Sequence, residues 1–361
     1  MPRKLKNHTT LQYVMINKTT ALIFILAAAV VVLVALLLPP VHAAVLHGKN
    51  PNNLLSLATK YDPDETRASV ISFEPLRDSM QKFMAENQLD AAIYVVNLRN
   101  GVNFGINENV GAFPASLNKV PVAIVAMREV EQGNLRLDSP ISINPGKVKS
   151  NSVEISANSG IINISPISAD IYKNNKELSL RTLLELMLKE SDNDALRMIL
   201  TQIDYEDLLA FYNYVDVDAY GSYDYVSSNA SNRLLSAKAL SNVFLSLYHS
   251  TILEPKDSQY LLSLLTETNL DARKLAQLPE YVKIAHKFGI YDDADQNHLF
   301  RDCGIIYSGK SRILYCVVIK GQQKEQAIAM TGRMIRAIYS YIIDNDITLD
   351  VYKSRNRDRQ I

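Results

Sequence analysis

Strand-like segments lie at both ends of this chain, and a long block of helical segments separates them. Residues 91–98 and 102–106 are apolar runs that flank Asn100-Gly101, a pair that strongly favours a β-hairpin. Three more strand-like runs and a closing amphipathic helix lie near the C-terminus, at 281–289, 302–307, 312–320 and 323–343. Strands from both ends can join one antiparallel sheet, so the order of segments predicts an α+β fold with a helical subdomain packed beside that sheet.

Several segments outside the strands show helical spacing of apolar residues or signals for a helix start. Helices are expected at 73–88, 116–131, 180–188, 236–248 and 255–266, with a further one that begins near Asn193. Residues 139–179 are rich in Ser, Asn and Ile and predict an irregular excursion with short strands. Residues 205–228 carry many Tyr and Asp residues without a long period, so no helix is predicted there.

The first forty residues combine basic side chains with a long apolar run. Four basic residues precede 18 apolar residues that run from Ala21 to Leu38, a length that can cross a bilayer as a helix. Because positive charge stays on the cytoplasmic side, the pattern predicts a cytoplasmic basic segment at 1–20, a transmembrane anchor at 21–38 and a linker at 39–70. Pro39-Pro40 and the small-residue site at 41–43 leave a cleaved signal peptide open as the alternative. Both interpretations export the rest of the chain, either bound to the cell membrane by a single helix or secreted.

Charge and metal-ligand patterns argue against several classes of function. The chain carries 38 basic and 38 acidic residues, which gives no electrostatic reason to expect nucleic acid as a partner. Its six histidines form no metal-ligand spacing, and the sequence contains no glycine-rich phosphate loop. Neither a metal nor another cofactor is therefore predicted.

The only two cysteines lie on either side of a predicted hairpin turn. Cys303 and Cys316 flank Gly309-Lys310, and in a tight hairpin centred there the two residues would face each other across the strands. Export to an oxidising compartment would then allow a disulfide between them. Two small buried side chains that stay reduced are the alternative.

Three short strings of residue types that suit catalysis occur in one order along the chain. They are Ser116-Leu117-Asn118-Lys119, Ser191-Asp192-Asn193 and Lys287-Phe288-Gly289. On a helix, residues three apart share a face, so the Lys119 amine can approach the Ser116 hydroxyl. A serine becomes nucleophilic when a base takes its proton, and a lysine can be that base when burial and a second cation lower its pKa. We expect Lys287 to be that second cation.

Together the strings resemble the S-x-x-K, S-D-N and K-T-G signatures of penicillin-binding proteins and class A β-lactamases. The resemblance extends from about Phe73 to Ile343 and covers most of the chain. It implies a catalytic domain at 71–345 with the β-lactamase layout of sheet and helices, followed by a polar tail at 346–361.

The resemblance also implies roles for individual residues. The catalytic residues would be Ser116, Lys119, Ser191 and Lys287. The substrate-binding residues would be Asn193, Gly289 and Ile290. Ser191 would relay a proton to the leaving amine, Asn193 would hold the substrate amide, and Lys287 would attract a substrate carboxylate. Gly289 would let the acyl group lie against its strand, and the backbone N–H of Ile290 would complete an oxyanion hole with that of the nucleophile.

The chain departs from the family pattern in two places. Phe288 stands where the family has a hydroxyl residue, which removes one donor for a substrate carboxylate. The E-x-x-L-N string, whose glutamate activates the hydrolytic water in class A β-lactamases, is missing. Glu206 lies too early to replace it, and Asp218 and Asp224 are nearer the expected place but belong to no motif. An acyl-enzyme is therefore expected to form and to hydrolyse slowly.

Two other matches are interpreted as structural. Ser79 and Lys82 also have the S-x-x-K spacing, but no S-D-N string follows at a suitable distance, so we expect an ordinary surface pair. His286 alternates to the strand face opposite Lys287, which favours a structural role.

These patterns predict a serine acyl hydrolase that needs no cofactor and forms an acyl-enzyme with β-lactams or D-alanyl-D-alanine-like amides. A penicillin-binding D,D-peptidase with slow deacylation is one alternative. A non-catalytic sensor or scaffold that binds cell-wall peptides is another. The expected partners are a small substrate and the membrane, without nucleic acid, and the protein is expected to be a monomer.

Overall fold

The computed structural model describes Leu54 and residues 72–143, 166–215, 235–292, 298–309 and 311–357. By its contacts the chain divides into Met1–Asn53 and Leu54–Ile361, and only the second unit contains described residues. The predicted basic segment and transmembrane anchor therefore lie outside the described residues, as do Asp218 and Asp224. Within the described ranges, no helix combines the length and the apolar composition that a membrane crossing requires.

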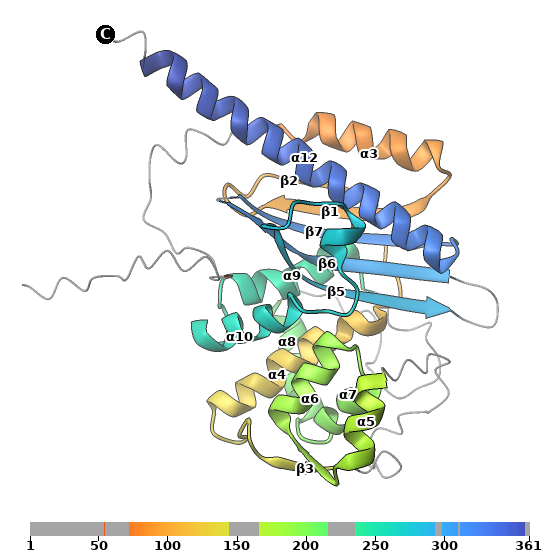
Figure 1. The fold of residues 1–361 in the computed structure, drawn as a ribbon, viewed down its shortest axis with the longest axis vertical. Coiled ribbons are helices and arrows are strands. Elements are labelled where there is room, and N and C mark those ends of the chain that lie inside the picture. Colours follow the sequence, from red (N-terminus) through yellow and green to blue (C-terminus); the bar gives the residue numbers. More distant parts are fainter. Residues whose placement is uncertain are drawn as a thin grey trace, which may run out of the picture. The chain divides into compact units, whose positions relative to one another are not determined.

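One antiparallel sheet of five strands joins segments from both ends of the sequence, as predicted (Figure 1). Its strands are, in spatial order, β2 (Asn103–Ile106), β1 (Asp90–Asn97), β7 (Ser311–Lys320), β6 (His298–Ser308) and β5 (Lys283–Asp292). β1 pairs with β7, with Ile93 opposite Val317, and this pairing connects the two ends of the chain. β5 lies at the edge of the sheet, so alternate N–H and C=O groups of its backbone have no strand partner.

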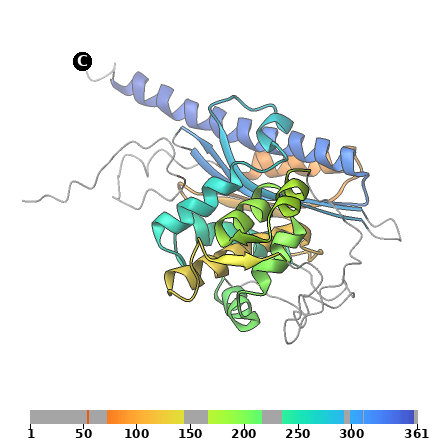
Figure 2. The same cartoon turned by 60° about the horizontal axis from the view of Figure 1, so that its bottom comes forward.

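Helices cover both faces of the sheet. α3 (Glu74–Glu86) and α12 (Lys324–Arg357) lie together on one face, over a cluster of buried apolar side chains (Figure 1). On the other face α9 (Ala237–Tyr248) packs against β6 and β7. The remaining helices are α4 (Lys119–Glu131), α5 (Pro166–Asn174), α6 (Leu180–Lys189), α7 (Asn193–Leu200), α8 (Tyr205–Tyr214), α10 (Pro255–Leu265) and the short α11 (Ala272–Leu275). Figure 2 shows the helical subdomain in front of the sheet.

Side chains at the helix starts explain where several of these helices begin. Ser179, Asp192 and Ser236 each accept a hydrogen bond from the backbone N–H three residues later, in the first turns of α6, α7 and α9. Such caps contribute about 1 kcal/mol each. Pro255 occupies the first turn of α10, where its missing N–H costs no hydrogen bond. These four starts agree with the predicted ones.

Two helices of the subdomain lie in segments for which the sequence predicts none. α5 lies inside the 139–179 excursion, whose two short strands β3 (Pro140–Ser142) and β4 (Glu177–Ser179) pair as a separate small sheet. α8 lies in the segment rich in Tyr and Asp, and it buries Leu208, Phe211 and Tyr212. Tertiary burial of these side chains outweighs the weak helix propensity of the segment.

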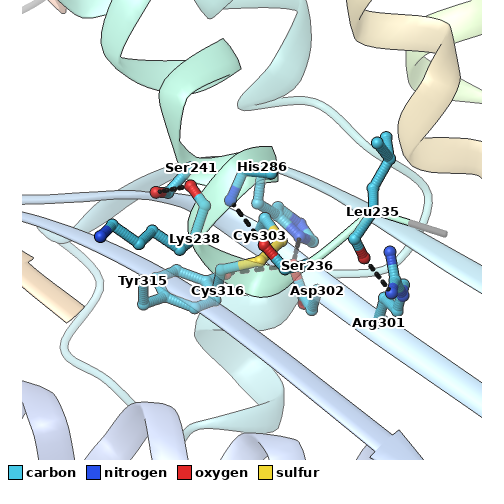
Figure 3. Close-up of a disulfide and its surroundings, with 11 residues drawn as sticks. Leu235, Ser236, Lys238, Ser241, His286, Arg301, Asp302, Cys303, Tyr315 and Cys316 are labelled. Carbon is cyan, nitrogen blue, oxygen red and sulfur yellow. Dashed lines mark hydrogen bonds and ion pairs between the residues drawn. A yellow bond between two sulfur atoms is a disulfide. The ribbon is translucent and has the colours of Figure 1, made fainter. Parts of the chain in front are cut away.

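The hairpin between β6 and β7 has the predicted register. Ser308 lies opposite Ser311, so Cys303 lies opposite Cys316. The two cysteines form a disulfide across the strands (Figure 3). The alternative, in which Cys303 and Cys316 stay reduced, is therefore wrong.

Residues on both sides of 71–345 also belong to the structured unit. Leu54, in the predicted linker, is buried; its N–H donates to Gln259 Oε1 at 2.7 Å, and its carbonyl accepts from the Tyr307 hydroxyl at 2.7 Å. At the other end α12 continues through much of the predicted tail, as far as Arg357. The described part of the chain thus includes residues on both sides of the segment that the motifs mark.

Candidate active site

Ser116 lies in a short 3₁₀ turn, η1 (Ala115–Asn118), that leads directly into α4. Lys119 is the first residue of α4, and it is only 2% exposed. Its Nζ donates to Ser116 Oγ at 2.9 Å and to Asn193 Oδ1 at 2.7 Å. The first and second strings therefore meet at one amine, although Lys119 and Asn193 are 74 positions apart in the sequence.

Burial sets the protonation of Lys119. It lowers the pKa of this side chain to about 7, while the charge of Asp192 opposes the shift and the charge of Arg197 adds to it. A pKa near neutrality leaves a large share of the amine unprotonated, and only the free amine can accept the Ser116 proton. The sequence predicts Lys287 as the second cation behind this shift. In the structure burial is the main cause, and Arg197 of α7 is the cation that adds to it.

The loop between α6 and α7 holds the S-D-N string in place. Asp192 is fully buried, and its Oδ1 accepts hydrogen bonds from the Ala195 N–H and from the Tyr172 hydroxyl, each at 2.7 Å. Tyr172 belongs to α5, which the sequence does not predict, so no sequence signal pointed to this brace. Ser191 has a φ of 59°, a left-handed conformation that is uncommon for serine, and Asn193 begins α7. These contacts agree with Asp192 as a brace, and the proton relay by Ser191 stays a prediction.

Gly289 brings the third string against the nucleophile. A Cβ atom at this position would lie 2.9 Å from the backbone N of Ser116 and 2.9 Å from the Cβ of Ala115. Glycine is therefore needed because β5 passes directly against η1, and the expectation that it also makes room for the acyl group stays a prediction. Ile290 follows on the same edge strand, so its backbone N–H stays the predicted second oxyanion donor beside that of Ser116.

Lys287 is fully buried on β5. Burial and the charge of Lys119 hold the pKa of Lys287 well below its usual value, and the charges of Asp302 and Glu190 act against this shift. Its Nζ lies 5.0 Å from the centre of the Phe288 ring and has no hydrogen-bond partner among the described residues. The charge of Lys119 thus reaches Lys287 on the neighbouring strand.

The Phe288 side chain and its surroundings change what the site can offer to an anion. Phe288 stacks on Phe300 and packs with the apolar cluster beneath α3 and α12. Arg301 lies opposite Gly289 on β6, is fully buried, and donates through Nη2 to the Leu235 carbonyl at 2.7 Å (Figure 3). Its Nε and Nη1 have no partner within the described ranges, and burial lowers its pKa to about 9. Arg301 therefore adds a cation beside Gly289, and sequence spacing does not single it out.

Other residues considered from the sequence lie at the surface. Ser79 and Lys82 are exposed on α3, and Lys82 pairs with Glu86 at 3.8 Å, as expected for a surface pair. Glu206 is exposed in the first turn of α8. In the part of the chain that the structure describes, no group of three His, Cys, Asp or Glu side chains is arranged to hold a metal ion.

Comparisons with known proteins identify the family and the fold. Residues 75–342 match a family model described as "Beta-lactamase enzyme family". Among solved structures, the chain is similar to the TLA-1 extended-spectrum β-lactamase, with a TM-score of 0.64, 17% identity, and coverage of 76% of this chain and 100% of that chain. A search of curated proteins found no significant match.

Two further solved structures share the fold. A β-lactamase from Chitinophaga pinensis has a TM-score of 0.63 and 20% identity, with 74% of this chain and 99% of that chain covered. PBP-A has a TM-score of 0.58 and 19% identity, with 74% and 96% covered. At these identities the structural similarity establishes the α+β fold and leaves the chemistry to the site itself.

Proposed function

The chain belongs to the β-lactamase enzyme family, and we propose from its site that it is a serine acyl hydrolase with Ser116 as nucleophile and Lys119 as general base. One observation carries this proposal: Lys119 Nζ lies 2.9 Å from Ser116 Oγ and belongs to a buried amine whose pKa is about 7. An exposed lysine could not take this role because it would keep its proton at neutral pH.

The proposed reaction begins when the Ser116 hydroxyl proton passes to the Lys119 amine and Oγ attacks the carbonyl carbon of an amide. Collapse of the tetrahedral intermediate breaks the C–N bond, and the leaving nitrogen takes up a proton relayed by Ser191. The product is an ester between Ser116 and the acyl group, which water hydrolyses to a carboxylic acid and free serine. Backbone N–H groups of Ser116 and Ile290 would stabilise the oxyanion, by about 3 kcal/mol per donor.

β-Lactams and D-alanyl-D-alanine-like amides are the proposed substrates, and both carry a carboxylate near the reactive amide. Lys287 and Arg301 are buried basic side chains on neighbouring strands, and both have N–H groups without a partner among the described residues. A bound carboxylate would favour their protonated forms, which would replace the hydroxyl donor that Phe288 cannot supply. A variant of PBP-A was solved as an acyl-enzyme complex with penicillin G, which makes penicillin a reasonable probe.

A missing deacylation motif favours a penicillin-binding D,D-peptidase as the second candidate. Glu206 is the only glutamate between Asn193 and Ser236, and it is exposed at the start of α8. Without a carboxylate to activate water, the acyl-enzyme would accumulate. Turnover of a chromogenic cephalosporin would favour the β-lactamase, whereas a stable one-to-one adduct would favour the peptidase. The predicted N-terminal helix would hold the domain outside the cytoplasmic membrane, where both substrates occur.

A labelled penicillin tests the proposal on the full-length chain in detergent. Mass spectrometry should find one penicillin bound to the peptide that contains Ser116, and none in Ser116→Ala. Ser79→Ala is the matched control, because Ser79 has the same spacing to an exposed Lys82, and its labelling should equal that of the unaltered chain. An unmodified Ser116 in folded protein after prolonged exposure would refute the enzyme and favour the sensor or scaffold.

A further inference from the structure

The lead-in segment, residues 112–115, connects to the nucleophile and is fixed at its upstream end by a short β-bridge. The Leu235 N–H donates to the Ala112 carbonyl at 2.9 Å, and the Ala112 N–H donates to the Leu235 carbonyl at 3.2 Å. The same Leu235 carbonyl accepts a hydrogen bond from Arg301 Nη2 at 2.7 Å. The chain before Ser116 is thus tied both to the start of α9 and to β6.

The downstream end of the lead-in segment has an unusual backbone conformation. Ala115, directly before Ser116, has a φ of 50°, in the left-handed region that alanine rarely adopts. A residue other than glycine in this region stores strain, which persists only where surrounding contacts hold it, and such residues are concentrated at functional sites. The turn that presents Ser116 therefore needs support from outside the lead-in segment.

An aromatic pair supplies a contact at this turn. The centre of the Phe113 ring lies 4.7 Å from the centre of the Tyr291 ring, and the two ring planes are tilted by 52°. At this separation aromatic rings attract each other beyond the effect of burial alone. Both side chains are half-buried, and both pack against the same apolar cluster. The pair therefore joins the lead-in segment to β5, which is distant in the sequence.

Tyr291 belongs to the part of β5 that the proposed reaction uses. It follows Ile290, and it lies on the same sheet face as Gly289, because side chains alternate along a strand. Gly289 meets Ala115 and Ser116 directly, so β5 contacts the nucleophile and its lead-in segment through the residues on both sides of Ile290. The two proposed oxyanion donors, the N–H groups of Ser116 and Ile290, belong to the two segments that these contacts join.

We propose that Phe113 and Tyr291 are positioning residues, whose paired rings hold Ala115 in its left-handed turn and so fix the Ser116 backbone beside β5. This inference rests on the proposed function of the site. An aromatic pair and a left-handed alanine involve free energies of the same order, so loss of the pair lets a large share of the molecules relax at the turn. Neither ring needs to touch the substrate, and neither residue belongs to the three strings.

The conformation of Ala115 tests this inference without any substrate. In the full-length chain labelled with ¹³C-alanine, the Cα and Cβ chemical shifts of Ala115 report its backbone conformation, and Ala115→Gly assigns the two signals. In Phe113→Leu and in Tyr291→Leu these shifts should move away from their left-handed values. A change of backbone conformation moves the two shifts in opposite directions, which the loss of a ring current does not. Shifts that keep their values in both leucine variants would overturn the inference.

Acylation by penicillin gives the functional readout. Phe113→Leu and Tyr291→Leu should each lower the acylation rate about tenfold. The double variant should lose little more than either single variant, because each change breaks the same pair. Tyr291→Phe keeps the ring and should keep the rate. Losses that simply add, or a loss in Tyr291→Phe equal to that in Tyr291→Leu, would overturn the inference.

Glycine at position 115 separates positioning of the turn from general damage. Glycine adopts a positive φ about as readily as a negative one, so Ala115→Gly makes the turn less dependent on the aromatic pair. In the Ala115→Gly background, Tyr291→Leu should therefore lower the acylation rate by a smaller factor than in the unaltered chain. Lower stability cannot produce this rescue, because glycine itself increases the conformational freedom of the unfolded chain. A loss of the same size in both backgrounds would overturn the inference.

Phe104 of β2 provides a matched control in the other apolar cluster of the sheet. Its ring is buried, and its centre lies 5.7 Å from that of Phe73. Phe104→Leu breaks this pair and should lower stability in urea unfolding, but it should leave the acylation rate and the Ala115 shifts unchanged. A loss of rate equal to that in Tyr291→Leu would overturn the inference. If the unaltered protein is never acylated, the proposed function fails, and the Ala115 shifts still decide whether the aromatic pair holds the turn.

Discussion

Replacing Gly289 with alanine tests most directly how β5 positions the nucleophile. The added Cβ would lie 2.9 Å from Ser116 N and from Ala115 Cβ, whereas ordinary contact begins at 3.4 Å. One of the two segments must therefore move by about half an ångström, the difference between these distances. No side-chain rotation relieves the clash, because the atoms involved belong to the backbone or lie directly next to it.

The displacement acts on the atoms that carry the reaction. The Ser116 N–H is one of the two proposed oxyanion donors, and loss of one such donor typically lowers the rate by about 10²–10³-fold. A misplacement of about 1 Å near the reacting atoms has a similar effect, about 10²-fold. We therefore expect Gly289→Ala to lower the acylation rate by about 10²-fold. Overpacking should also cost about 1–3 kcal/mol of stability.

Stopped-flow acylation with a fluorescent penicillin, together with urea unfolding, separates these two effects. Gly133→Ala is the matched control, since Gly133 has a φ of 82° after the end of α4 and a Cβ there would meet nothing within 4 Å. The control should lose about 1 kcal/mol through backbone strain and keep the unaltered acylation rate.

Two results would refute this reasoning. A Gly289→Ala protein that is acylated at the unaltered rate would mean that β5 does not fix the Ser116 backbone. An equal loss of acylation rate in Gly133→Ala would show that lower stability causes the loss. The close approach of β5 to η1 would then not be its cause.

Three further outcomes are expected. Lys119→Met should abolish acylation and should raise the free energy of unfolding at pH 8 by about 3 kcal/mol, measured by thermal unfolding. The gain arises because the unfolded chain binds a proton on Lys119 that the buried amine releases near pH 7. It should shrink as the pH rises towards 10.5, where the unfolded chain also loses this proton. Tyr172→Phe should cost about 1.5–3 kcal/mol in urea unfolding, since the buried Asp192 carboxylate loses a hydrogen bond, and an unchanged midpoint would contradict the brace. Replacing Cys303 and Cys316 by alanine should cost about 3 kcal/mol by opening a loop that spans a sequence separation of 13, and reducing agent should no longer affect the variant.

The sheet is predictable from sequence because its signals are local. Asn100-Gly101 fixes the first hairpin, and the turn at Gly309-Lys310 fixes the register that places Cys303 opposite Cys316. α5 and α8 carry no comparable local signal. They form because the domain buries their apolar side chains, and this burial depends on contacts that are distant in sequence.

The residues that support the site are harder to predict than those of the three strings. Tyr172 reaches Asp192 only because α5 docks beside the S-D-N loop. Arg301 lies opposite Gly289 only because β5 and β6 adopt one register, and the connection between them, at 293–297, carries no turn signal that fixes it. The pKa of Lys119 depends on burial, which spacing along the chain does not reveal. Motif spacing therefore identifies the reacting groups, and the fold supplies their environment.

Buried basic side chains help to distinguish a catalytic site from a binding scaffold. Lys119, Lys287 and Arg301 are at most 2% exposed, and burial lowers the pKa of each. Moving a cation out of water costs several kcal/mol unless it is paired and hydrogen-bonded, and Lys287 Nζ has no partner in the part of the chain that the structure describes. A scaffold would become more stable with apolar residues at the lysine positions, whereas acylation at Ser116 requires a free amine beside the hydroxyl. The cost of keeping these basic side chains buried therefore supports the enzyme over the scaffold, and an unaltered protein that is acylated while its more stable Lys119→Met variant is not would separate the two.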